Sequence, residues 1–146
     1  YRLGGGAGLN VQSSDFNGTD TDTLAANFDL GRFYSEHLEL GVRFGFTSVD
    51  AGTAETDTLS TLILGRWYVD SRSATRPWFE IGLGTSNVDT GTVDVSGFLY
   101  AIAIGVTQFL NDHVAIEVGL RESIGSYDDG IDSDVLDVNV GLAVFF

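Results

Sequence analysis

The segment Leu38-Glu39-Leu40-Gly41-Val42-Arg43-Phe44-Gly45-Phe46 alternates large apolar residues with glycine and charged residues. A period of two places alternate side chains on opposite faces of a β-strand. A face made of glycine, Glu39 and Arg43 is a poor filler for a core that excludes water. We therefore expect a barrel whose apolar face points outward and whose polar face lines the interior.

The opening of this segment, in which an apolar, a charged and an apolar residue precede a glycine, recurs along the chain. The other copies are Tyr1–Gly4, Phe79–Gly82 and Ile116–Gly119. Between them lies a second pattern, an apolar residue followed by glycine, at Leu30-Gly31, Leu64-Gly65, Ile104-Gly105 and Val140-Gly141. Interleaved, the two sets predict an all-β fold of eight antiparallel strands that follow one another up and down.

Composition narrows the class of protein. With 146 residues, the chain is expected to form one domain, residues 1–146. The net charge of −14, from 21 acids against seven arginines, argues against a nucleic-acid partner. Cysteine is absent, so disulfides and thiolate metal sites are excluded. Because the first strand begins at once, we expect a mature, processed form.

Alternation also predicts which charged residues point into the barrel. They are Arg2, Asp29, Glu39, Arg43, Glu80, Glu117, Arg121 and Asp137. A charge in so narrow a space must be paired or hydrated, since its desolvation costs several kcal/mol. We expect a polar core of salt bridges, and a narrow gated pore is the alternative.

The fourth strand is ambiguous, because either of its faces is apolar enough to point outward. The two sets are Leu59, Ile63 and Trp67, and Leu62, Leu64 and Tyr68. Alignment of Gly65 with the inward glycines of other strands chooses the second set as outward. Arg32 and Arg66 then also point outward, where long side chains can reach lipid phosphates.

The same alignment turns four large rings inward near the short-turn end. These are Phe33, Trp67, Phe109 and Phe145. An interior of eight strands is only wide enough for side chains. We therefore expect the four rings to plug that end, with further aromatic residues, Tyr68 and Trp78 among them, forming a girdle around it.

Tight turns are predicted at Ser35–His37, Asp70–Arg76 and Asn111–His113. Longer acidic loops are predicted at Ser13–Thr23, around Asp50 to Asp57, around Asp89 and Asp94, and at Ser126–Asp134. The last loop holds weak calcium candidates, Asp128, Asp129, Asp132 and Asp134, but it lacks the spacing of an EF-hand. We expect solvated loops and no cofactor, with loosely bound Ca²⁺ or Mg²⁺ as the alternative.

Outward apolar strands of about ten residues, with short turns at one end and longer loops at the other, are typical of a transmembrane β-barrel. With eight strands, essentially the whole chain resembles the small OmpA/OmpX-type barrels of Gram-negative outer membranes. The most specific feature is the C-terminal alternation, which resembles the signal by which such barrels are recognised for assembly. It consists of Val138, Val140, Leu142, Val144 and Phe146.

The resemblance implies a monomer in the outer membrane of a Gram-negative bacterium, in contact with lipids, lipopolysaccharide and the barrel assembly machinery. It implies a structural or surface-interaction role without catalysis. Barrel enzymes that acylate or deacylate lipid A need a His and a Ser near the extracellular rim, whereas His37 and His113 lie in short turns at the other end. Two alternatives remain, a narrow gated channel for ions or small solutes and a soluble lipocalin-like binding barrel, which would need apolar inward residues.

Overall fold

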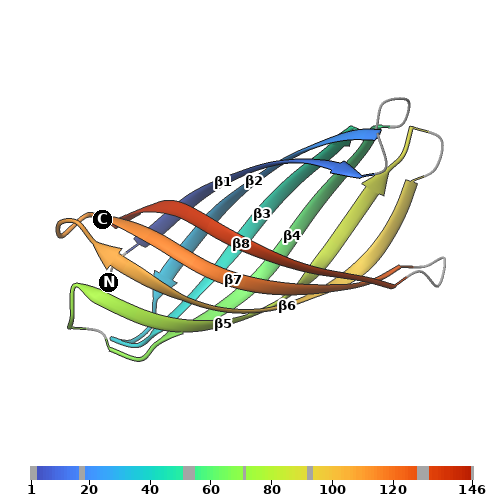
Figure 1. Cartoon of the computed structure of the whole chain (residues 1–146). Coiled ribbons are helices and arrows are strands. Elements are labelled where there is room, and N and C mark those ends of the chain that lie inside the picture. Colours follow the sequence, from blue (N-terminus) through green and yellow to red (C-terminus); the bar gives the residue numbers. More distant parts are fainter. Residues whose placement is uncertain are drawn as a thin grey trace.

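Eight antiparallel strands form a closed barrel in which each strand pairs with its sequence neighbours and the last pairs with the first (Figure 1). The computed structural model describes the backbone of residues 3–16, 19–50, 55–70, 72–91, 94–127 and 132–145, and the side chains of residues 24–50, 56–70, 72–91, 94–127 and 132–145. The strands are β1 (Leu3–Phe16), β2 (Thr19–Phe33), β3 (Leu38–Asp50), β4 (Glu55–Tyr68), β5 (Thr75–Asp89), β6 (Asp94–Phe109), β7 (Val114–Tyr127) and β8 (Asp132–Phe145). The predicted eight-stranded up-and-down architecture is confirmed. Within the described ranges, no helix is long and apolar enough to cross a bilayer.

The seam between β1 and β8 lies at the short-turn end of the barrel. It runs from the pair Gly4 and Phe145 to the pair Gly8 and Gly141. By contrast, β1 pairs with β2 from Leu3 to Phe16. Figure 1 shows β1 and β8 diverging toward the opposite end. The short-turn end is therefore the part of the barrel that these described strands close by hydrogen bonding.

The strands are longer than the sequence pattern predicts, and the expected loops are correspondingly wrong. The predicted loop Ser13–Thr23 is mostly strand, because β1 reaches Phe16 and β2 begins at Thr19. Likewise, β3 extends to Asp50 and β8 begins at Asp132. Threonine has a high β-propensity, and antiparallel pairing continues through these polar ends. Polar residues in these segments therefore do not mark the end of a strand.

Side-chain exposure alternates along the strands as predicted for β2, β3 and β5 to β8. On the outer face, Ile81 and Ile104 are 61% and 62% exposed. On the inner face, Glu39, Arg43 and Glu80 are buried. This arrangement inverts that of a water-soluble protein, in which apolar residues fill the core. An apolar outer face suits contact with lipid, and a polar inner face suits an interior of hydrogen-bonded side chains.

The predicted faces of β4 are wrong. Leu62, Leu64 and Tyr68 are buried inside the barrel, whereas Ile63 and Trp67 lie on the outer face. The cause is Gly65, which points outward, so that an added Cβ there would lie 3.5 Å from the outward Leu40. Arg66 consequently points inward and is buried, contrary to prediction.

Two of the tight turns have the same construction. The Nδ1 atom of His37 lies 2.8 Å from the carbonyl oxygen of Tyr68, and that of His113 lies 3.0 Å from the carbonyl oxygen of Phe145. Because a carbonyl can only accept, Nδ1 carries the proton in both rings. Each histidine thus ties its turn to the end of the adjacent strand, β4 or β8.

The third turn is held by Asp70. Its carboxylate accepts hydrogen bonds from the backbone N–H groups of Arg72 at 2.9 Å and Ser73 at 3.3 Å. These bonds favour the charged form and hold the pKa of Asp70 below its usual value. All three connections at this end are therefore compact.

Acidic residues near the opposite end form an acidic collar on the outer face. We define the acidic collar as Asp50, Asp57, Asp89, Asp94, Asp132 and Asp134, which alternate with inward residues along their strands. The register places several of them directly opposite one another, Asp57 opposite Asp89 and Asp89 opposite Asp94. Like charges in opposed positions destabilise a sheet. The collar therefore lowers the stability of this end of the barrel.

Replacement of Asp57 by Asn should stabilise the barrel, because it removes one charge of an opposed pair and because Oδ1 of Asp57 is buried without a hydrogen-bond partner. We expect a gain of about 0.5 kcal/mol in the free energy of unfolding, measured by urea unfolding in detergent micelles. The gain should shrink at high salt. Asp112→Asn, in an exposed turn at the other end, is the control and should change little. An unchanged or lower stability of Asp57→Asn would show that the opposed charges cost nothing.

Candidate functional site: the barrel interior

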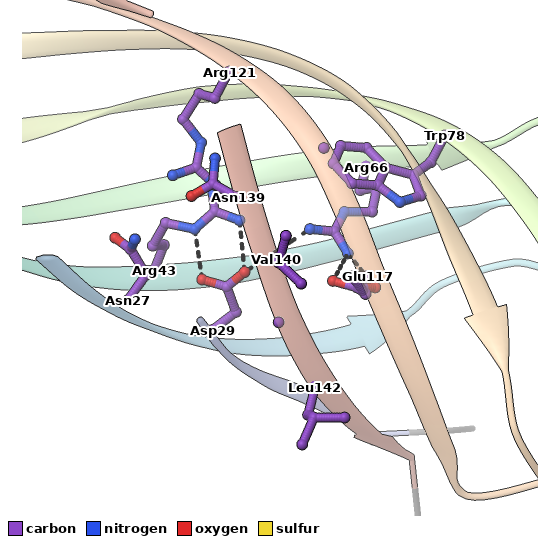
Figure 2. Close-up of a pocket in the computed structure, with 12 residues that line it drawn as sticks. Asn27, Asp29, Arg43, Arg66, Trp78, Glu117, Arg121, Asn139, Val140 and Leu142 are labelled. Carbon is purple, nitrogen blue, oxygen red and sulfur yellow. Dashed lines mark hydrogen bonds and ion pairs between the residues drawn. The ribbon is translucent and has the colours of Figure 1, made fainter. Parts of the chain in front are cut away.

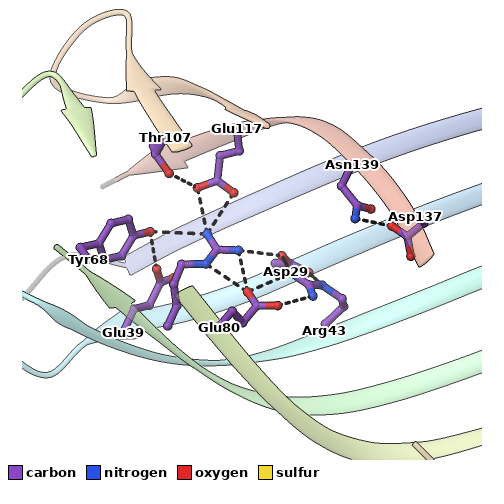
Figure 3. A network of polar contacts seen from close by, with 10 residues as sticks. Asp29, Glu39, Arg43, Tyr68, Glu80, Thr107, Glu117, Asp137 and Asn139 are labelled. Carbon is purple, nitrogen blue, oxygen red and sulfur yellow. Dashed lines mark hydrogen bonds and ion pairs between the residues drawn. The ribbon is translucent and has the colours of Figure 1, made fainter. Parts of the chain in front are cut away.

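The interior is crossed by a layer of ion pairs centred on Glu80 (Figure 3). The Glu80 carboxylate, 1% exposed, accepts from Nη1 of Arg43 at 2.6 Å and from Nη2 of Arg66 at 2.8 Å. Arg43 also donates two parallel hydrogen bonds to Asp29, from Nε at 2.5 Å and from Nη2 at 2.6 Å. Bidentate charge-assisted bonds of this kind are the strongest in proteins and compensate the desolvation of the charges.

The layer continues across the barrel through Arg66. Its Nη1 lies 2.9 and 3.0 Å from the two carboxylate oxygens of Glu117 on β7, and Thr107 on β6 donates to Glu117 at 2.8 Å. On the other side, the hydroxyl of Tyr68 donates to Glu39 at 2.9 Å. Side chains of β2 to β7 are therefore joined in one hydrogen-bonded network, the ion-pair layer.

Strand register brings opposite charges together in this layer. Arg43 lies directly opposite Asp29, and Arg66 lies opposite both Glu39 on β3 and Glu80 on β5. Residues directly opposite on one face of a sheet are close enough to interact. The register of neighbouring strands thus determines which of these charged side chains meet.

The structure brings five of the predicted interior charges together, Asp29, Glu39, Arg43, Glu80 and Glu117. Arg121 and Asp137 also point inward but form no ion pair with described residues. Arg2 lies outside the described residues. Sequence reasoning missed Arg66, which was placed outside. The predicted interior contained more acids than arginines. This excess could have indicated that Arg66 points inward, because an inward Arg66 reduces the excess.

Aromatic rings cover the short-turn side of the ion-pair layer and form an aromatic floor of Phe33, Tyr68, Phe109 and Phe145. Ring centroids lie 5.4 Å apart for Phe33 and Tyr68, 6.1 Å for Phe33 and Phe145, and 4.8 Å for Phe109 and Phe145. Trp67 does not belong to this floor, contrary to prediction. It lies outside and stacks on His37 at 5.6 Å. Because the inward and outward faces of β4 are the reverse of those predicted, Tyr68 takes the inward position expected for Trp67.

Trp78 is a second aromatic residue that was expected in the outer girdle but is buried inside. The guanidinium of Arg66 lies 4.2 Å from the centre of its ring, a cation–π contact. The ring rests on Gly105 and Gly119, and a Cβ added at Gly119 would come within 2.8 Å of Cη2. The absence of side chains at these two positions makes room for the indole.

Among the described residues, two cavities are lined by inward side chains of the barrel. One, of about 40 Å³, lies beside Arg43 and Arg66 of the ion-pair layer, Trp78 and Arg121 (Figure 2). A water molecule needs roughly 10–15 Å³ on this measure, so this cavity holds a few waters at most. The other, which we call the chamber, measures about 570 Å³ and lies toward the loop end. Among the side chains that the structure describes, the interior is thus filled at the short-turn end and hollow toward the loop end.

The remaining predicted sites lie on the outer surface or outside the described residues. Asp132 and Asp134 are exposed at the start of β8, and Asp128 and Asp129 are not described. Among the described residues, there is no group of three or more acidic, histidine or cysteine side chains that could hold a metal. Val138, Val140, Leu142 and Val144 point outward on β8, whereas Phe146 is not described.

No protein-family model matches the sequence, and no curated protein sequence matches it. Solved structures do match. Neisserial surface protein A is 15% identical, with a TM-score of 0.67 over 99% of this chain and 94% of that one. The N-terminal β-barrel domain of Pseudomonas aeruginosa OprF is 13% identical, with a TM-score of 0.67 over 99% and 96%. The chain therefore has the fold of small Gram-negative outer-membrane β-barrels.

The fold by itself does not decide between a binding and a catalytic role. The outer membrane enzyme PagL is also similar, with 15% identity and a TM-score of 0.53 over 100% of this chain and 99% of that one. Both histidines of the present chain lie at the short-turn end and are engaged with backbone carbonyls. The chemistry of the interior must therefore carry the functional argument.

Replacement of Arg66 by Gln should destabilise the barrel by about 3–5 kcal/mol, because the buried Glu80 and the partly buried Glu117 lose their shared partner. Equilibrium unfolding in detergent micelles measures the change. Arg72→Gln is the matched control, since Arg72 is 87% exposed and its contact to Glu36 is 3.8 Å long. Equal stabilities for the two variants would contradict the central role of Arg66.

Gly119→Ala should destabilise the barrel by about 1–3 kcal/mol, since the new methyl group collides with the rigid Trp78 ring. The penalty should shrink in a Trp78→Leu background, which a double-mutant cycle of unfolding free energies would measure. Gly65→Ala is the control, because its methyl group would make an ordinary contact at 3.5 Å. Equal penalties with and without Trp78 would exclude the collision as the cause.

Proposed function

We propose that this chain is an integral outer-membrane β-barrel with a structural or surface-interaction role, and that it does not act as an open pore. The outer face supports insertion, because its apolar side chains, such as Ile63 and Ile104, are more than half exposed in the isolated chain. Lipid contact removes that surface from water. The short turns face the periplasm and the acidic collar faces the outside, as in barrels of this fold.

The observation that carries the proposal is the closure of the interior. The ion-pair layer and the aromatic floor lie one behind the other and leave a cavity of about 40 Å³ between the side chains of the layer. A hydrated ion needs a continuous water-filled path. In this barrel such a path requires several buried ion pairs to separate together, which costs several kcal/mol for each exposed charge.

A catalytic role is not part of the proposal. Deacylation or acyl transfer requires a nucleophile activated by a base within hydrogen-bond reach. His37 and His113 each use Nδ1 to hold a strand end at the short-turn side. Three carboxylates of the layer, Asp29, Glu80 and Glu117, are paired with arginines, and the fourth, Glu39, accepts a hydrogen bond from the Tyr68 hydroxyl. None of the four lies within reach of a histidine that it could activate in a catalytic pair, since both histidines are bonded to backbone carbonyls in the turns.

The surface presented to other molecules includes the acidic collar and the strand ends that carry it. Its charge favours divalent cations between the collar and the phosphates of neighbouring lipopolysaccharide, since direct contact of the two would be repulsive. We propose lipid and lipopolysaccharide as the immediate partners of the outer face.

Planar-bilayer recording tests the proposal. The unmodified protein should insert into lipid and give no steady conductance, with rare and small openings at most, because the layer and floor block the path. Tyr68→Ala and Phe109→Ala remove rings from the floor and should increase the frequency of openings. A large, stable conductance of the unmodified protein would instead establish the narrow channel.

Trp67→Ala provides the matched control for these recordings. Trp67 is an aromatic residue adjacent to Tyr68, but it lies on the outer face and stacks on His37. Its replacement should leave the frequency of openings unchanged. A monomer that stays soluble without detergent would contradict membrane insertion and favour the soluble binding barrel.

A further inference from the structure

Arg121 on β7 is a buried charge to which the described side chains give no ion-pair or hydrogen-bond partner. It is 8% exposed, and among the described side chains it forms no ion pair or hydrogen bond. Its Nε is buried and unsatisfied. By contrast, Arg43 donates from all three of its nitrogens to Asp29 and Glu80. Because an unpaired charge at membrane depth is costly to keep, it indicates a function.

The carboxylate expected to neutralise Arg121 is hydrogen-bonded to another residue. Asp137 lies directly opposite Arg121 in the register of β7 and β8. Its Oδ1 instead accepts a hydrogen bond from the side-chain amide of Asn139 on the same strand (Figure 3). Strand register thus places a carboxylate opposite Arg121, but the two side chains form no ion pair.

Arg121 faces both cavities and therefore stands at the boundary between the ion-pair layer and the chamber. Figure 2 shows its guanidinium group directed toward Arg43 and Asn139. Arg43 is already paired with Asp29 and Glu80, whereas Arg121 has no ion-pair partner among the described residues. An anion placed there would face the unsatisfied donors of Arg121 at short range.

Most of the rest of the chamber wall is neutral and rich in hydrogen-bonding groups. Hydroxyl and amide side chains from several strands line it, including Asn27, Thr47, Ser60, Ser86, Ser123 and Asn139. Its described charged residues are Arg43, Arg121 and Asp137, two cations against one acid. The acidic collar is on the outer face of the wall and does not line the chamber.

We propose that Arg121 is the anion-binding residue of a ligand site in the chamber, and that the site takes a small anion that also carries hydroxyl groups, such as a sugar acid. The guanidinium offers a planar pair of donors that matches a carboxylate. The hydroxyl and amide groups of the wall suit the hydroxyls of the ligand. A volume of about 570 Å³ lies within the range of small-molecule sites. The proposal does not depend on whether the barrel conducts.

Titration of the purified barrel in detergent micelles with glucuronate tests the site. Glucuronate should bind saturably and shift the NMR resonance of the Arg121 Nε–H group. Glucose, which lacks the charge, and acetate, which lacks the hydroxyls, should each bind at least about tenfold more weakly. No saturable glucuronate binding, or glucose binding as tight as glucuronate binding, would overturn the proposal.

Variants assign the binding to Arg121. Arg121→Gln should weaken glucuronate binding at least about tenfold, whereas Arg72→Gln, in an exposed turn, should not change it. Unchanged binding by Arg121→Gln would refute the assignment.

Asp137→Asn keeps the proposal testable if Arg121→Gln fails to fold. Removal of the one carboxylate among the described chamber-lining residues should tighten glucuronate binding. If Asp137 were the true partner of Arg121, the same variant would destabilise the barrel without tightening binding, and that result would overturn the site.

Discussion

The shared use of Glu80 by Arg43 and Arg66 is the interaction on which the interior depends. Its carboxylate, buried from solvent, is held between two guanidinium groups that reach it from β3 and β4. Through Arg66 the same contact extends to Glu117 on β7, across the barrel from β3. Backbone hydrogen bonds define a cylinder, but they do not determine how its interior is filled. The ion pairs do so, because a partner at hydrogen-bond distance offsets the desolvation of a buried charge.

Glycine complements the large residues of this interior. Trp78 lies on Gly105 and Gly119, and Glu39 lies over Gly31, where an added Cβ would come within 2.8 Å of its carboxylate carbon. In a space this narrow, a large side chain on one strand requires a missing side chain on its neighbour. Gly31, Gly105 and Gly119 therefore mark where a large side chain of another strand lies.

The interior has two parts with different chemistry. At the short-turn end, charged and hydroxyl groups are hydrogen-bonded to one another and rings cover them, so that little space remains. Toward the loop end, the wall carries hydroxyl and amide groups around a chamber, and Arg121 is unsatisfied at its boundary. Proteins that share this fold include surface proteins and an enzyme. The division of the interior into these two parts comes from the side chains of this chain, which the fold alone does not specify.

The sequence by itself determined the number of strands, their up-and-down order and the outward faces of β2, β3 and β5 to β8. A period of two is a local property, and in these strands one face is clearly apolar. In β4 both faces carry large apolar residues, so that hydrophobicity could not choose between Ile63 and Leu62, and alignment on Gly65 gave the wrong face.

Only the tertiary structure decided which face of β4 points inward. Pairing with β3 and β5 places Arg66 opposite Glu39 and Glu80, and Leu62 beside the space left by Gly82. The partners of the charges were undetermined for the same reason, since closure of the barrel selects which side chains meet, joining Arg66 to Glu117 and leaving Arg121 alone among the described residues.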